Sequence, residues 1–155
     1  MRIKIVALGN KMPQWINQGF QEYYQRLHCQ WPIETHWISL NKRNKASSID
    51  KLQTQEGNKM LQAIPDNAHV IALDQSGKTW STEKLAQQCD YWQSIGEKIT
   101  FLIGGPEGLA PQCLKRAHQI WSLSELTLPH PLVRVILVEQ LYRAWSILNN
   151  HPYHK

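Results

Sequence analysis

The stretch KITFLIGGPEG, residues 98–108, decides the fold because an apolar run passes directly into a glycine-rich loop. Residues 99–103 are apolar at nearly every position, which is typical of a strand buried on both faces of a sheet. Three glycines around one proline then expose main-chain amides in a rigid turn. Pro111 suits the first turn of a helix that follows. A buried strand that leads through a loop into a helix indicates an α/β fold.

The rest of the chain repeats this alternation on both sides of residues 98–108. Strands are predicted at 2–8, 33–40, 69–74, 98–103 and 120–123. Helices are predicted at 13–29, 49–64, 81–95, 111–118 and 130–148. We interpret 75–78 as a turn and 149–155 as a tail. The pattern predicts an α/β fold with a mainly parallel sheet flanked by helices, in a single domain over residues 1–155.

The charge of the chain is unevenly distributed. The sequence has 17 Lys and Arg residues against 12 Asp and Glu residues, for a net charge of +5. Residues 1–60 hold all of this excess, which hints at a polyanionic partner such as nucleic acid. With 42% hydrophobic residues the chain can bury a core, which excludes wholesale disorder.

Several classes of protein are excluded by missing motifs. No apolar segment is long enough to span a bilayer, and residues 1–9 lack the features of a signal peptide. Cys29, Cys89 and Cys113 are too far apart in sequence for a zinc motif or a disulfide framework. Neither a dinucleotide fingerprint, a P-loop nor a nucleophile elbow is present. We therefore expect a cytoplasmic protein without a metal ion or a membrane partner.

Ligands of parallel α/β sheets bind at the carboxyl ends of the strands. This rule directs attention to the segments that begin at Asp74, Gly104 and Ser124. The loop 104–108 is either a tight connection or a main-chain grip on a ligand. Residues 121–131 are apolar although no regular structure is predicted for most of them, so their amides and carbonyls need partners. Either neighbouring loops or a ligand could supply those partners.

The helix predicted at 130–148 is apolar almost all round. A terminal helix of a small domain normally keeps a polar face, so we expect the sheet to cover one side and a second copy of the chain the other. Glu139 and Arg143 are spaced i,i+4 on this helix. They form either a surface ion pair or part of an active site.

Several long motifs resemble those of the SPOUT superfamily of methyltransferases, in particular its small bacterial members that modify the large-subunit rRNA. The motifs are GNKMPQW at 9–15, VIALDQSGK at 70–78, IGGPEGL at 103–109, WSLSELTLPHPLVR at 121–134, EQLYRAW at 139–145 and NHPYH at 150–154. The resemblance implies a C-terminal deep trefoil knot, a homodimer and S-adenosylmethionine as cofactor. It also implies methylation of N3 of a pseudouridine in bacterial 23S rRNA within the assembled ribosome. The alternative is a ribosome- or RNA-binding factor without methyltransferase activity.

The resemblance also implies roles for particular residues. The expected cofactor contacts, largely through main-chain groups, are Leu73, Gly104, Gly108, Leu123, Ser124, Glu125, Leu126, Thr127 and Leu128. The N3 proton of pseudouridine must be removed or the resulting anion stabilised, which makes several side chains catalytic candidates. These candidates are His130, Glu139, Arg143, His151, Tyr153 and His154, and which of them is the base stays open. From its composition, the basic loop with Lys42, Arg43 and Lys45 is expected to contact RNA phosphates and to leave cofactor affinity unaffected.

Overall fold

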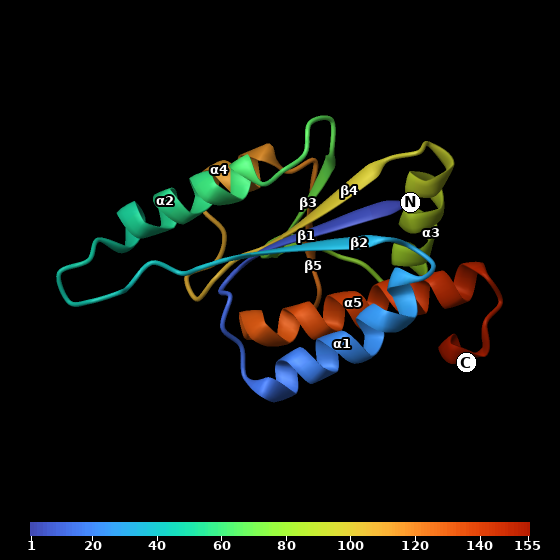
Figure 1. The fold of residues 1–155 in the computed structure, drawn as a ribbon. Coiled ribbons are helices and arrows are strands. Elements are labelled where there is room, and N and C mark those ends of the chain that lie inside the picture. The colour runs from blue at the N-terminus through green and yellow to red at the C-terminus, as the bar shows by residue number, and fades with distance from the viewer.

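The computed structural model describes residues 1–155 and contains one five-stranded sheet in which every pairing is parallel. The strand order is β2-β1-β4-β3-β5. The strands are β1 Arg2–Leu8, β2 Ile33–Ile38, β3 His69–Thr79, β4 Lys98–Ile103 and β5 Gln119–Ser122. Figure 1 shows this sheet between two layers of helices. The predicted α/β class and the mainly parallel sheet are confirmed.

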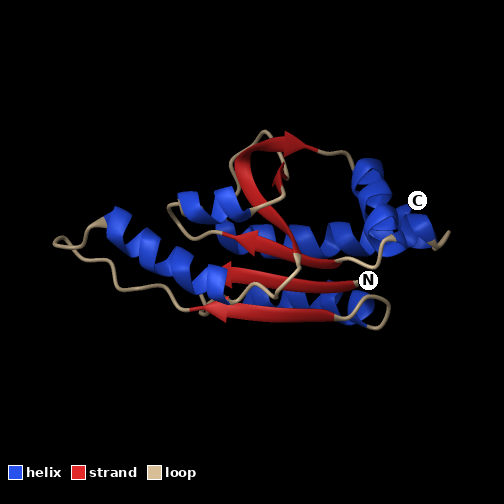
Figure 2. Ribbon diagram, turned by 90° about the horizontal axis from the view of Figure 1, so that it is seen from above, coloured by secondary structure: helices blue, strands red, loops and turns tan.

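The helices divide between the two faces of the sheet. They are α1 Gln14–His28, α2 Ile49–Gln62, α3 Thr82–Ser94, α4 Pro111–Arg116 and α5 His130–Leu148, followed by a short 3-10 helix Pro152–His154. Side chains of α1, α3 and α5 form one hydrophobic core with the sheet, and α2 and α4 form a smaller core on the other face (Figure 1). Figure 2 shows that both chain ends lie at the same end of the molecule, where β1 begins.

Local signals explain most of the element boundaries. Ser81 caps α3 as predicted, because its Oγ accepts a hydrogen bond from the backbone N–H of Lys84. Gly96 follows α3 with a φ of +70°, a conformation in which glycine ends helices without strain. Strand β4 pairs with β1 and β3 and buries every residue after Lys98, as its apolar sequence predicts.

Residues 75–78, predicted as a turn, lie within β3, which continues to Thr79, but residues 74–77 form a bulge there because Leu73 and Lys78 both pair with Trp121. The pairing of β3 with β5 shifts between Leu73 and Lys78 and then resumes with Lys78 opposite Trp121. Glycine at position 77 is typical of a turn, but here it allows β3 and β5 to approach closely. A Cβ at Gly77 would lie 2.5 Å from the carbonyl carbon of Ile120.

Helix α5 lies between α1 and α3 and has part of its surface in the larger core. Leu137, Val138 and Leu141 are fully buried there together with residues of the sheet. Leu132 and Ile136 are half-buried and lie outside that core. Coverage of this surface by a second copy stays a prediction, as does the trefoil knot. No helix is long and apolar enough to cross a membrane.

Replacement of Gly77 by alanine should destabilise the fold. The new methyl group would collide with the β5 backbone, and overpacking of this kind typically costs about 1–3 kcal/mol. Urea unfolding followed by tryptophan fluorescence measures the change. The control is Lys78→Ala, at the next position of the same strand and exposed, which should change the free energy of unfolding by less than about 0.5 kcal/mol. Equal stability of Gly77→Ala and wild type would contradict the close strand approach.

Candidate active site

A cavity of about 620 Å³ lies at the carboxyl ends of β3, β4 and β5. Its walls come from three chain segments, residues 73–75, 103–109 and 121–130 except Glu125, together with Val133. This volume falls within the range of about 300–1,000 Å³ that is usual for small-molecule sites. The structure therefore brings together the three segments to which the carboxyl-end rule directed attention.

Eight of the nine predicted cofactor residues line this cavity. They are Leu73, Gly104, Gly108, Leu123, Ser124, Leu126, Thr127 and Leu128. Glu125 instead faces a neighbouring hollow beside Gly77 and Lys78. The cavity also contains Asp74 and Glu107, which were not among the predicted site residues.

The loop 104–108 folds back on itself. The backbone N–H of Gly108 donates to the carbonyl of Gly105 at 3.0 Å, and Gly108 has a φ of +80°. A Cβ at Gly104 would lie 2.5 Å from the carbonyl carbon of Gly108. The loop therefore needs glycine at both positions, and its main chain forms one wall of the cavity.

The segment 123–128 forms the facing wall with unusual backbone bonding. None of its residues makes a hydrogen bond from main chain to main chain. The Oγ of Ser124 accepts from the N–H of Leu126 at 2.9 Å, and the Oγ of Ser122 donates to the carbonyl of Ser124 at 2.8 Å. The N–H groups of Leu123, Glu125, Thr127 and Leu128 have no partner in the chain. A ligand in the cavity is therefore a suitable partner for main-chain groups of this segment.

His130 is the one predicted catalytic residue that lines the cavity. It lies at the start of α5, where its Nε2 is 3.8 Å from the position that a Cβ would take at Gly9. The nearby guanidinium of Arg134 is buried, donates to the carbonyls of Leu8 and Gly9, and lies 4.5 Å from the ring centre of Trp37. Burial, together with the charge of Arg134, lowers the pKa of His130 below its usual value.

Three further candidates meet along the second half of α5. Glu139 and Arg143 form an ion pair of 2.6 Å, and the hydroxyl of Tyr153 donates to the Glu139 carboxylate at 2.9 Å. The guanidinium of Arg143 also lies 4.8 Å from the ring centre of Tyr153. Glu139 lies nine positions along the helix from His130, which is about 13.5 Å along the axis. The tail with His151 and His154 packs at the far end of α5 (Figure 1).

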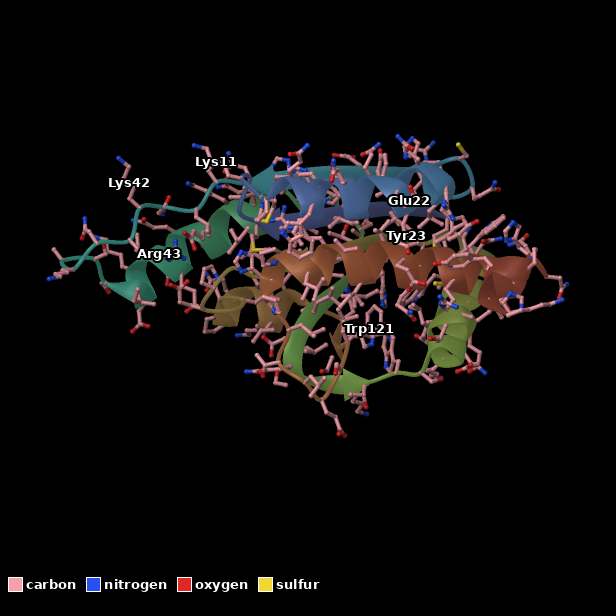
Figure 3. The ribbon with its side chains drawn as sticks, turned by 90° about the horizontal axis from the view of Figure 1, so that it is seen from below. Lys11, Glu22, Tyr23, Lys42, Arg43 and Trp121 are labelled. Carbon is pink, nitrogen blue, oxygen red and sulfur yellow. The ribbon has the colours of Figure 1, made fainter.

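The basic loop lies outside the cavity, where it extends from the body of the protein beside α2 (Figure 1). Lys42 and Lys45 are exposed, whereas Arg43 turns inward to Glu56 and Glu107. Figure 3 shows Lys11 and Lys42 projecting at the same edge of the molecule, while Arg43 lies against α2. Lys11 was not among the predicted RNA contacts. It is distant from Lys42 in the sequence, and only the fold brings the two to the same edge.

Comparison with known proteins identifies the class. The chain matches the family described as "Predicted SPOUT methyltransferase" over residues 1–154, and it belongs to this family of methyltransferases. It is 50% identical over 155 residues to the ribosomal RNA large subunit methyltransferase H of Marinomonas sp. (strain MWYL1), with both chains covered completely. The protein of the same name from Hahella chejuensis (strain KCTC 2396) is also 50% identical, over 100% of this chain and 99% of its own.

A solved structure supports the fold at low sequence identity. The probable methylase family protein from Haemophilus influenzae Rd KW20 aligns with a TM-score of 0.58 at 14% identity. The alignment covers 99% of this chain and 70% of that one. The family match and the two relatives confirm the resemblance to the SPOUT family that the motifs indicated.

Proposed function

We propose that this chain is an S-adenosylmethionine-dependent methyltransferase that modifies N3 of a pseudouridine in bacterial 23S rRNA. In this proposal it is a single-domain cytoplasmic enzyme that works as a homodimer on the assembled ribosome. The main support is the cavity at the carboxyl ends of β3, β4 and β5, with two walls of main-chain groups. The names of the relatives and the membership of a methyltransferase family agree with this function.

The residues of the cavity fit S-adenosylmethionine. Main-chain groups of 123–128 that lack partners in the chain suit the hydrogen-bonding edge of an adenine. Leu73 and Leu128 offer apolar contacts to its ring, and Asp74 offers a carboxylate to the amino or hydroxyl groups. When bound, S-adenosylmethionine supplies an electrophilic methyl group on a sulfonium.

The acceptor nitrogen must lose its proton before or during methyl transfer. Burial and the charge of Arg134 lower the pKa of His130 and so favour its neutral imidazole, in which one ring nitrogen can take up this proton. The buried guanidinium of Arg134 holds the start of α5 to the end of β1 and so positions His130 at the cavity. We assign His130 the role of general base.

The cluster of Glu139, Arg143 and Tyr153 is too far along α5 to act with His130 of the same chain. In the proposed homodimer this cluster and the tail of one chain complete the cavity of the other. The half-buried Leu132 and Ile136 on α5, and Leu126, which is 75% exposed at the cavity, offer apolar surface for that contact. Arg143 would then stabilise negative charge on the acceptor base.

The first test of the proposed function combines cofactor binding with analysis of the product. Calorimetry should show micromolar binding of S-adenosylmethionine, and Gly104→Ala should abolish it because the new methyl group disrupts loop 104–108. Mass spectrometry of 23S rRNA from a deletion strain should show loss of a 3-methylpseudouridine. A protein that binds ribosomes but not the cofactor would instead be the RNA-binding factor without methyltransferase activity.

The second test is the pH dependence of methyl transfer. A base with a lowered pKa stays neutral to lower pH, so the rate should fall only at a pH below the titration range of an ordinary histidine. His130→Ala should lose about 10²- to 10⁴-fold in rate and should also lose this acid limb. His36→Ala, an exposed histidine outside the cavity, is the control. An unchanged acid limb in His130→Ala would place the base elsewhere.

The third test asks whether each site uses two chains. We expect His130→Ala and Glu139→Gln each to be inactive alone. If the residues act across the dimer, each mixed dimer has one intact site and one site that lacks both residues. About half of the dimers in an equal mixture refolded together are mixed, so about a quarter of wild-type activity should be recovered. Mixing with wild-type chains calibrates the exchange of subunits. No recovery in a mixture that has exchanged would mean that both residues act within one chain.

A further inference from the structure

We propose that Arg43 is a positioning residue of the cofactor site and not a contact to RNA. It ties Glu107, in the loop 104–108, to Glu56 of α2. The basic loop that carries Lys42 and Lys45 is thereby joined to a wall of the cavity. This inference rests on the proposed function for the identity of the cofactor.

All hydrogen-bond donors of Arg43 are already used within the chain. Its Nε donates to Glu107 Oε1 at 2.8 Å and its Nη2 to Glu107 Oε2 at 2.7 Å. Its Nη1 donates to Glu56 Oε1 at 2.8 Å and to the carbonyl of Asn41 at 2.9 Å, and its Nη2 donates to Glu56 Oε2 at 2.9 Å. A guanidinium has five N–H groups, so none is left for a phosphate.

The charges around Arg43 agree with this internal role. Glu56 is only 1% exposed, and Arg43 is its ion-pair partner. Hydrogen bonds from Arg43 lower the pKa of Glu107, and the two carboxylates raise the pKa of Arg43 above its ordinary value. The three side chains together carry a net charge of −1, so Arg43 adds no free positive charge to the loop.

Helix α2 supports the same segment at a second place. Gln53 donates from its Nε2 to the carbonyl of Glu107 at 3.1 Å and to that of Leu109 at 3.4 Å. A Cβ at Gly57 would lie 2.7 Å from the Cβ of Ala110. The cavity wall at 104–109 is therefore held from outside by α2, and Arg43 is the part of this support that comes from the basic loop.

The exposed lysines of the loop provide matched controls. Lys42 adjoins Arg43 and is exposed, and Lys45 is exposed two positions beyond Arg43. Figure 3 shows Lys42 directed away from the protein and Arg43 directed toward α2. Loss of either lysine removes the same charge as loss of Arg43 but leaves loop 104–108 untouched.

The experiment is a double-mutant cycle on the affinity for S-adenosylmethionine. Arg43→Ala and Glu107→Gln should each raise the Kd about tenfold, and the double variant should be no weaker than either single variant. Lys42→Ala should change the Kd less than twofold. In steady-state kinetics Arg43→Ala should raise KM for the cofactor with little change in KM for the ribosome. Arg43→Lys should restore only part of the affinity, because an ammonium cannot hold two carboxylates in a planar fork.

A second variant separates the inference from misfolding, and a hydrogen-exchange measurement separates it from failure of the proposed function. Arg43→Leu combined with Glu56→Gln avoids a buried unpaired carboxylate and should show the same rise in Kd. Hydrogen exchange of residues 105–109, without cofactor, should be faster in Arg43→Ala and Glu107→Gln than in wild type or Lys42→Ala. Absence of cofactor binding by the wild-type protein would refute the proposed function, whereas the exchange data would still test the support by Arg43.

Two results would overturn the inference. One is an unchanged cofactor Kd in Arg43→Ala together with weaker ribosome binding and a shallower salt dependence, which identifies a phosphate contact. The other is a double variant whose loss is the product of the two single losses. That result would mean that Glu107 contacts the cofactor and that Arg43 does not act through it.

Discussion

The parallel direction of all five strands is the constraint on which the site depends. Each strand of a parallel sheet releases the chain at the same edge, so the segments after β3, β4 and β5 must meet there. These segments are separated by up to about fifty residues in sequence, yet together they form one cavity. The same constraint leaves the opposite edge to the chain ends, which explains why the tail packs far from the cavity of its own chain.

Arg134 connects this edge of the sheet to the last helix. Arg134 is only 3% exposed, and a buried guanidinium is costly without partners. Its Nη2 donates to two carbonyls at the end of β1 and the group faces the ring of Trp37, while its Nε has no partner. Burial lowers the pKa of Arg134 to about 10, so it remains charged at neutral pH. One buried side chain thus fixes where α5 begins and where His130 lies.

The fold is predicted well from the sequence wherever a residue pattern has only one structural explanation. Apolar runs and alternating apolar positions together predict all five strands, and the carboxyl-end rule locates the cavity. The course of β3 at Gly77 is not predicted, because a glycine is needed both in turns and where two backbones approach closely. Composition places Arg43 among the basic loop residues, but it cannot show that Glu56 and Glu107, 13 and 64 positions away, use its donors. The distance between His130 and the tail likewise depends on packing that no local motif encodes.

The structure shows which basic residues among the first 60 remain free of ion pairs and where they lie. Three basic residues of the first 60 are neutralised in ion pairs, namely Lys4, Arg26 and Arg43. Of the six that remain, five are lysines, at positions 11, 42, 45, 51 and 59, and they belong to the loop before α1, the basic loop or α2. An ammonium group attracts phosphate as a point charge, and phosphate contacts orient a polyanion without selecting a sequence. In the proposed function, recognition of a single pseudouridine therefore has to come from the cavity and from the tail, where the polar groups are fixed by packing.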